Sequence, residues 1–265
     1  MKSKMFSLMA LLLLAIGCKD QKKSSGTEET VSTDTVQSSI SIEKLEGSPE
    51  YSDAVLKMVK PAEPEIEPAE GGTDFEFELE NYELGTQTAS DLAGQLANSG
   101  DGQHIHFILD NQPYAAHYET SFKKELPEGT HYLVTFLSRS YHESVKNENA
   151  FIAEKIVVGD STGQLNVDLG EPTLIYSRPK GEYSGKDTEN LLLDFYLLNT
   201  TLSENGNFVR ATINGEEFDL TEWAPYIVKG LPKGEVTVKL ELLDGNGALL
   251  PGDFNSVERT VILKE

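Results

Sequence analysis

The stretch Leu231-Pro-Lys-Gly-Glu-Val-Thr-Val-Lys-Leu-Glu-Leu-Leu243 begins as a turn and continues as a strand. From position 236 to 242 every second residue is apolar, and Thr237, Lys239 and Glu241 stand between them. Because successive side chains of a β-strand point to opposite faces, this alternation places one row in a core and the other in solvent. The stretch therefore predicts a strand with one buried face, entered through a Leu-Pro-x-Gly turn.

The same turn occurs a second time, because the chain contains an internal repeat. Leu-Pro-Glu-Gly at 126–129 matches Leu-Pro-Lys-Gly at 231–234. Four further matches follow in the same order: 54–61 with 173–179, 75–84 with 190–198 (aligned from Phe77 onto Leu191), 104–110 with 208–214, and 154–158 with 259–263. Five matches in one order indicate a duplication.

Each copy consists of short runs of alternating polarity, broken by Gly, Pro and Asn, without a long helical period. This pattern is typical of antiparallel β-sandwiches. Leu-Pro-x-Gly before an alternating strand looks like the entry to the sixth strand of an immunoglobulin-type domain. We therefore predict an all-β fold of two tandem immunoglobulin-like antiparallel β-sandwiches, residues 50–160 and 168–265, following a lipoprotein signal and a disordered tether.

Composition excludes several classes of protein. The chain has 265 residues, a formal net charge of −22 and a single cysteine, Cys18. One cysteine excludes an internal disulfide framework and a zinc site built from several thiolates. So acidic a chain repels phosphates, which excludes nucleic acid as a partner.

Residues 1–17 have the pattern of a signal peptide. Lys2 and Lys4 precede an apolar stretch at 5–16, which is too short to cross a bilayer as a helix, since that requires roughly 20 residues. The stretch ends in Ala-Ile-Gly-Cys18, which resembles a bacterial lipobox; the alternative is an ordinary secretory signal with a chance cysteine. We expect Cys18 to carry lipid (palmitate) and to anchor the mature chain in a membrane.

The residue after the anchor and the segment that follows refine this expectation. Lys19, rather than aspartate, follows Cys18, which by resemblance to sorting rules in Gram-negative bacteria favours the outer membrane, with the protein facing the periplasm or the cell exterior. Residues 18–49 are rich in Ser, Thr, Lys, Glu and Gln and lack aromatic residues. Such a segment buries too little apolar surface to order itself, so we expect a disordered tether.

All five histidines lie in the first copy of the repeat. His104 and His106 are two residues apart on a predicted strand, so their side chains share one face. The second copy has Phe208 and Arg210 at these positions. Because a strand needs neither histidine to pair or pack, the fold alone does not explain them.

Two loops are expected to meet at the end of the sandwich where His104 begins its strand. One is the segment 85–103, which is longer than its counterpart in the second copy, and the other is 138–146. Binding surfaces of sandwich folds form where loops meet at one end. The candidate ligand-binding residues are His104, Arg139, His142, Glu143 and Lys146.

Three interpretations of this end stay open. Arg139, Lys146 and partly protonated histidines could hold an anionic or peptide ligand through a carboxylate or phosphoryl group, or a protein partner. Alternatively, His104, His106 and His142 could ligate copper or zinc, since two histidines on one strand face with a third from a loop form a recurrent metal pattern. In the third interpretation the histidines only form surface hydrogen bonds, and the protein is a structural spacer.

Catalysis is not predicted. Ser138, Ser140 or Ser144 near His142 could be imagined as a nucleophile with its base, but the chain has no Gly-x-Ser-x-Gly or His-Glu-x-x-His motif and no Gly-rich phosphate loop. We therefore expect a non-enzymatic protein without a cofactor, apart from the metal of the second interpretation.

Three segments also resemble a known group of proteins. Residues 103–114, 126–131 and 138–146 are similar to uncharacterised two-domain envelope lipoproteins of Gram-negative bacteria that are often labelled phosphopeptide-binding proteins. The similarity covers both copies and is most specific over 103–151. The resemblance implies a non-enzymatic secreted lipoprotein.

Overall fold

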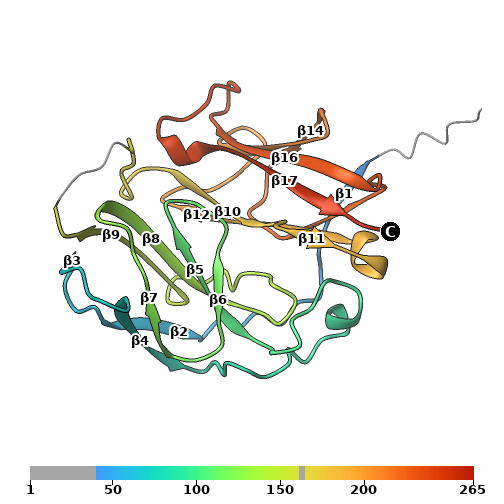
Figure 1. Ribbon diagram of the computed structural model, residues 1–265. Helices are drawn as coiled ribbons and strands as arrows, with labels where there is room; N and C mark the ends of the chain where they lie inside the picture. The colour runs from blue at the N-terminus through green and yellow to red at the C-terminus, as the bar shows by residue number, and fades with distance from the viewer. Residues whose placement is uncertain (1–39, 161–164) are drawn as a thin grey trace, which may run out of the picture. The chain divides into compact units, whose positions relative to one another are not determined.

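A computed structural model describes residues 40–160 and 165–265 of the protein (Figure 1). Within these residues the chain forms β-strands and three short 3-10 helices, η1 (Asp91–Gly94), η2 (Gly185–Thr188) and η3 (Asp253–Asn255). This confirms the all-β prediction. No helix in this part of the chain is long and apolar enough to cross a membrane. Cys18, the predicted signal peptide and the predicted tether up to residue 39 lie outside the described residues.

The first sandwich has two sheets. The smaller sheet has the order β2 (Val55–Lys60), β4 (Thr73–Glu80), β7 (Ser121–Lys124). The larger has the order β3 (Glu65–Ile66), β9 (Phe151–Val158), β8 (Gly129–Ser138), β5 (His104–Leu109), β6 (Ala115–His117). β3 pairs parallel with β9, whereas the other neighbours pair antiparallel.

The second sandwich repeats this arrangement. One sheet contains β15 (Tyr226–Lys229), β12 (Leu191–Leu198) and β10 (Thr173–Arg178), and the other has the order β11 (Glu182–Tyr183), β17 (Ser256–Leu263), β16 (Gly234–Leu243), β13 (Phe208–Ile213), β14 (Glu216–Leu220). In both sandwiches the chain changes sheets after its first strand and then pairs parallel with its last strand. The common topology confirms two tandem immunoglobulin-like sandwiches.

The strand register corrects one detail of the repeat. Met58 pairs with Phe77 in the first sandwich, and Tyr176 pairs with Phe195 at the equivalent place in the second. Phe77 therefore corresponds to Phe195, and the predicted alignment of Phe77 onto Leu191 is wrong by four residues. Apolar runs of this length fit several registers, and only the ladder distinguishes them.

The prediction of a disordered tether over residues 18–49 is wrong near its C-terminal end, because residues 41–44 form a strand. β1 (Ser41–Lys44) pairs antiparallel with β15 and so extends a sheet of the second sandwich. Ile40 is buried in the core of that sandwich, and Ile42 packs against it. These two alternating isoleucines supply the apolar surface that the rest of the segment lacks. The second domain is therefore residues 168–265 completed by β1.

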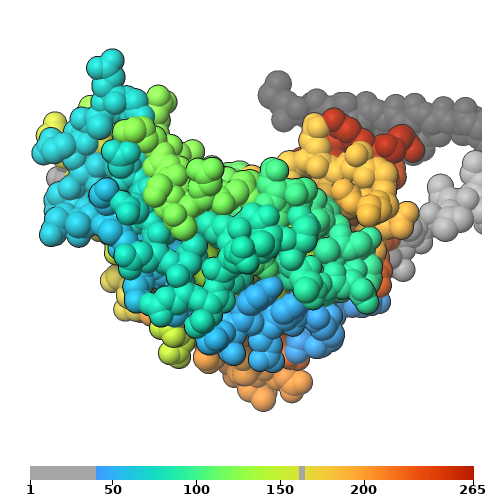
Figure 2. Space-filling model, turned by 90° about the horizontal axis from the view of Figure 1, so that it is seen from below, coloured from blue at the N-terminus to red at the C-terminus, as the bar shows by residue number. Residues whose placement is uncertain are grey.

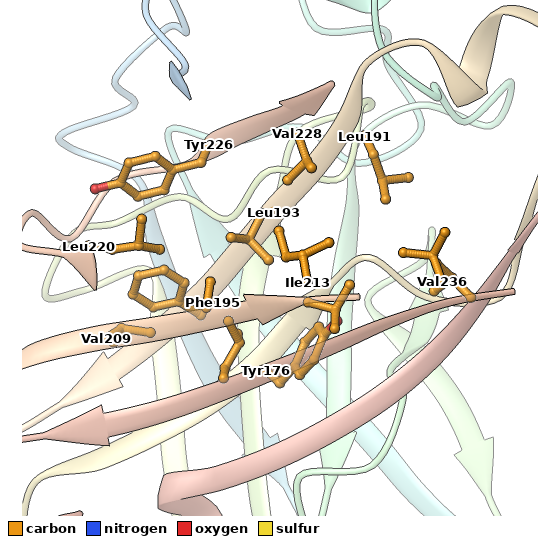
Figure 3. Packing of buried hydrophobic residues seen from close by; sticks show 14 of the residues in the cluster. Tyr176, Leu191, Leu193, Phe195, Val209, Ile213, Leu220, Tyr226, Val228 and Val236 are labelled. Atoms are coloured by element: carbon orange, nitrogen blue, oxygen red, sulfur yellow. The ribbon is translucent and has the colours of Figure 1, made fainter. Parts of the chain in front are cut away.

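The core of the second sandwich has the alternation that the sequence predicts. Val236, Val238 and Leu240 are buried in this core, together with residues from the facing sheet such as Phe195. Figure 3 shows Val236 and Phe195 among the side chains of this core. Burying each such side chain stabilises the fold by roughly 1.5–3 kcal/mol. Glu235 and Thr237 face solvent.

The two sandwiches pack face to face, and β12 shows why. Phe195 and its odd-numbered neighbours point into their own core, whereas Tyr196 and Leu198 on the opposite face pack against Phe136 of the first sandwich. The rings of Phe136 and Tyr196 stack with centroids 5.0 Å apart. Both faces of β12 are therefore buried, which explains its nearly continuous apolar sequence.

The equivalent strand of the first sandwich, β4, is acidic rather than apolar on its outward face. Its outward positions are Asp74, Glu76, Glu78 and Glu80, and they are exposed or half-exposed. The acidic face of β4 thus stays in solvent. It is the larger sheet of the first sandwich, which contains β5 and β8, that contacts the second sandwich.

Loop segments also form hydrogen bonds between the two sandwiches. Near η1, the carbonyl oxygens of Gly94 and Gln95 accept hydrogen bonds from Lys186 and Asn190, both at 3.3 Å. Figure 2 shows the segment around η1, in blue-green, beside the segment around η2, in yellow-orange. The interface thus runs from the central strands to this loop end.

Candidate functional site

The two loops predicted to converge do meet. Ser140 of the second loop donates its backbone N–H to Thr88 Oγ1 at 3.0 Å, and its own carbonyl accepts from the backbone of Ser99 at 2.8 Å. β5 pairs antiparallel with β8, so His104 lies opposite Ser138 at the start of the second loop. This confirms that the strand end and both loops come together.

Three histidines bring their ring nitrogens to one point at this end. His104 Nε2 lies 3.0 Å from His106 Nε2 and 3.1 Å from His142 Nδ1. The three nitrogens all lie within 4.8 Å of one another. His104 and His106 project from the same face of β5, as their spacing predicts, and His142 approaches from the loop after β8.

His142 reaches the cluster from an unusual backbone conformation. Its φ is +69°, in the left-handed region, where a residue other than glycine is disfavoured by roughly 1–2 kcal/mol. The backbone N–H of His142 donates to the carbonyl of Arg139 at 2.8 Å, which closes the turn. Strained backbone of this kind concentrates at functional sites.

The histidines are neutral. His104 and His106 are fully buried, and desolvation lowers the pKa of His104 to about 4. Burial also lowers the pKa of His106 and of His142, and the positive charge of Arg178 lowers both further. At neutral pH each ring therefore has one nitrogen with a free lone pair, which is the form that binds metals.

Hydrogen bonds among the three histidine rings satisfy their facing nitrogens poorly. His104 Nδ1 faces the carbonyl oxygen of Gly102 at 2.8 Å, so it must carry the proton, and Nε2 is then a bare acceptor with one lone pair. Two further ring nitrogens face that single lone pair. If His106 Nε2 and His142 Nδ1 both carry protons, they share one acceptor, His104 Nε2, in a poor geometry. If either of them lacks a proton, its lone pair faces the lone pair of His104 Nε2 at about 3 Å. A metal ion at the centre would use all three lone pairs.

Two residues that the sequence analysis missed complete the surroundings. The Tyr114 ring stacks on His106 with centroids 3.5 Å apart, and its hydroxyl lies 3.2 Å from His142 Nδ1. Ser177 Oγ, from the second sandwich, lies 3.2 Å from His106 Nδ1. A hydrogen-bond partner on the second nitrogen of a ligand histidine fixes its ring. Residues of both sandwiches therefore position this site.

The remaining predicted site residues form a separate cluster. Arg139 forms an ion pair with Glu143 at 3.0 Å, and both side chains are almost fully buried. Lys146 forms an ion pair with Asp194, a fully buried residue of the second sandwich. Glu143 also accepts a hydrogen bond from Ser48.

The predicted anion site at these residues is therefore wrong in one respect. Arg139 and Lys146 are each neutralised by a carboxylate, so they do not form the free basic spot that the sequence suggested. The predicted constellation divides into two parts, with His104 and His142 in the histidine cluster and the other three residues in a network of ion pairs.

The other two histidines have local roles. His131 lies 2.6 Å from Asp110 Oδ2 through its Nδ1. The His117 ring stacks on Phe122 with centroids 3.4 Å apart. Neither belongs to the three-histidine group.

Comparison with known proteins bears on the fold alone. No protein-family model matches the chain, and no curated protein matches it. Among solved structures, the fibronectin(III)-like modules of Clostridium thermocellum CbhA are 14% identical over 79% of this chain and 94% of that chain, with a TM-score of 0.27. The two tandem V-type regions of VCBP3, a v-region-containing chitin binding protein, are 10% identical over 80% and 99%, with a TM-score of 0.23.

A third similar structure is SGBP-B of the Bacteroides ovatus mixed-linkage glucan utilization locus, in complex with a mixed-linkage heptasaccharide. It is 10% identical over 79% of this chain and 70% of that chain, with a TM-score of 0.24. Such low scores carry no argument about ligands. One fold hosts many functions, so the function depends on the site rather than on the sandwich architecture.

Proposed function

We propose that this protein is a non-enzymatic envelope lipoprotein, held at a membrane by lipid on Cys18, that binds one copper or zinc ion through His104, His106 and His142. The observation that supports the metal is the convergence of three neutral imidazole nitrogens at 3.0 and 3.1 Å, two of them from the fully buried His104 and His106 and one from the half-buried His142. Imidazole nitrogen is a good ligand for both metals, and copper(II) binds such ligands more tightly than zinc.

Metal–nitrogen bonds to histidine are about 2.0–2.1 Å, which places nitrogens of a tetrahedral site roughly 3.3 Å apart. The two nitrogen pairs that include His104 would open by a few tenths of an ångström. The third pair, His106 with His142, lies within 4.8 Å and would adjust to the same separation. The Tyr114 hydroxyl lies 3.2 Å from His142 Nδ1, and burial raises its pKa, so it would stay a neutral phenol beside the metal.

The alternative of a peptide or anion at the loop end has less support. Its two cations, Arg139 and Lys146, already have carboxylate partners, and a ligand would have to displace Glu143 or Asp194. Replacing a buried carboxylate by a soluble ligand gains little, because the displaced carboxylate remains buried without its partner.

Calorimetric titration of the metal-free chain from residue 19 onward tests whether the protein binds copper(II) or zinc. This chain retains β1 and avoids the lipid. We expect one equivalent of copper(II) or zinc per chain, with affinity reduced at least 100-fold in His104→Ala and in His106→Ala. Electron paramagnetic resonance of the copper(II) form should show nitrogen hyperfine coupling.

His117→Phe is the matched control, because it removes a histidine of the same sandwich that lies outside the cluster. It should bind metal as the unmodified chain does. If neither metal gives a saturable heat, or if the two alanine variants bind as well as the control, the metal proposal is rejected and the structural spacer becomes the better description.

The anchor has its own test. In a Gram-negative host, Cys18→Ser should abolish metabolic labelling with palmitate and release the protein from the membrane fraction. Unchanged labelling would contradict the lipid anchor without affecting the metal site.

A further inference from the structure

Three cations gather next to the histidine cluster, in the second sandwich. Arg178 ends β10, Lys180 follows it before β11, and Arg259 lies on β17, which is adjacent to β11. Lys180 Nζ donates to the carbonyl of Tyr114 at 2.6 Å, and Arg259 donates to the carbonyl of Asn111 at 3.0 Å. Their positive charges are close enough that Arg178 and Arg259, after burial, help to lower the pKa of Lys180 to about 8.

These cations have no carboxylate partner. The described residues contain 13 ion pairs, and none includes Arg178, Lys180 or Arg259. This is unexpected in a chain with 44 acidic and only 22 basic residues. Burial of a cation is costly unless an anion or ordered donors and acceptors compensate it.

The internal repeat indicates which carboxylate would be the counter-ion of Arg178. In the first sandwich Lys60 and Glu76 are cross-strand neighbours and form an ion pair at 2.7 Å. Arg178 and Asp194 are cross-strand neighbours at the equivalent place, but Asp194 pairs with Lys146. The expected counter-ion of Arg178 is therefore bound to the other sandwich.

The unpaired cations are only partly compensated, by tyrosines and by the backbone carbonyl oxygens that accept from Lys180 and Arg259. Arg178 is 6% exposed, and its Nη1 donates to the Tyr183 hydroxyl at 2.7 Å, but its Nε is buried without a hydrogen-bond partner. The Lys180 Nζ lies 3.8 Å from the centroid of the Tyr114 ring, and the Arg259 guanidinium lies 4.2 Å from that of Tyr176. Aromatic faces attract cations but neutralise no charge. A buried guanidinium N–H without an acceptor calls for an explanation, and a bound anion that supplies the acceptor would be one.

We propose that Arg178, Lys180 and Arg259 form a binding site for a small oxyanion of the phosphate, sulfate or carboxylate class. Lys180 and Arg259 are partly exposed, so the anion reaches the site from solvent, and Arg178 forms its inner wall. The guanidinium groups supply directional donors, and Lys180 supplies a compact charge. This site is distinct from the histidine cluster and does not depend on a bound metal.

The test measures thermal unfolding and calorimetric binding of the chain from residue 19 onward, with EDTA present so that metals play no part. Inorganic phosphate, sulfate and acetate are titrated against sodium chloride at matched ionic strength. We expect a saturable rise in Tm and a measurable heat with at least one oxyanion, and no comparable effect of chloride.

Lys180→Gln and Arg259→Gln should each weaken oxyanion binding at least tenfold, whereas Lys155→Gln, at an exposed position on β9, should leave it unchanged. Arg178 is left unaltered because its burial makes a folding defect the expected result of replacing it. Equal effects of oxyanion and chloride would overturn the proposal, as would unchanged binding in both variants. Loss of oxyanion binding with retained metal binding would separate this site from the histidine cluster.

Discussion

Lys146 of the first sandwich forms an ion pair with Asp194 of the second, and the Asp194 carboxylate is completely buried. Asp194 also accepts a hydrogen bond from the backbone N–H of Ser144 at 3.0 Å. It lies on the face of β12 that otherwise carries apolar residues against the first sandwich. This ion pair is therefore a largely desolvated polar contact on an otherwise apolar face of β12.

Removing one partner of this pair should be costly. Lys146→Met leaves the Asp194 carboxylate buried without its counter-ion, and such changes destabilise proteins by about 3–5 kcal/mol. We expect a fall of about 3 kcal/mol in the free energy of unfolding, measured with urea. Lys57→Met, which breaks the exposed Lys57–Glu80 pair, should change it by less than about 1 kcal/mol. Equal small effects would mean that the buried pair contributes nothing to stability.

The strand β1 should stabilise the second sandwich. A chain that begins at residue 46 lacks the buried Ile40 and its partner Ile42, and it leaves β15 as an open edge. We expect it to be less stable than a chain that begins at residue 38 by about 3 kcal/mol, and to self-associate through the open edge. Urea unfolding and sedimentation measure the two effects. Indistinguishable chains would show that β1 is dispensable.

The sequence predicts the sandwiches well because alternation along strands such as β16 reports directly on burial. It could also have predicted which faces meet, since outward positions of β4 are acidic while those of β12 are mainly apolar. β1 was missed because a strand of four residues in a polar segment gives little signal on its own. Its ordering depends on β15, which is far away in the sequence.

The site was predicted in part for a similar reason. His104 and His106 share a face through local strand geometry, and the loop carrying His142 converges on them through antiparallel pairing. Tyr114 and Ser177 depend on a hairpin and on the packing of one sandwich against the other, which strand periodicity does not encode. Nor does sequence pattern show that Lys146 is paired with Asp194, 48 residues away.

His117→Phe should stabilise the protein. The His117 ring stacks on Phe122, and its Nε2 is buried without a hydrogen-bond partner. Phenylalanine keeps the stacking and removes the unsatisfied nitrogen, whose burial costs roughly 1–3 kcal/mol. We expect the free energy of unfolding at pH 7 to rise by about 1 kcal/mol. A loss of stability would indicate that His117 has a partner that a phenyl ring cannot replace.

The metal-free protein should lose stability in weak acid. Burial lowers the pKa of His104 and of His117 to about 4, from about 6.5 in an unfolded chain, and it also lowers the pKa of His106 and of His142. Between pH 6.5 and 4 the unfolded chain therefore binds protons that the folded protein does not. The free energy of unfolding then falls as the pH falls, by roughly 1.4 kcal/mol per pH unit for each such histidine.

Glu143 acts in the opposite direction, because burial raises the pKa of its carboxyl group and the folded protein takes up that proton first. Burial also raises the pKa of the Glu154 carboxyl group. Four histidines outweigh these two carboxyl groups, so the net change should still be a loss. Urea unfolding in EDTA at several values between pH 7 and 4.5 measures it. In His117→Phe one proton fewer is bound on unfolding, so the fall should be shallower by about one histidine's share. A free energy of unfolding that stays constant or rises over this range would show that the folded protein admits protons to the buried cluster, and the neutral state assigned to these histidines would be incorrect.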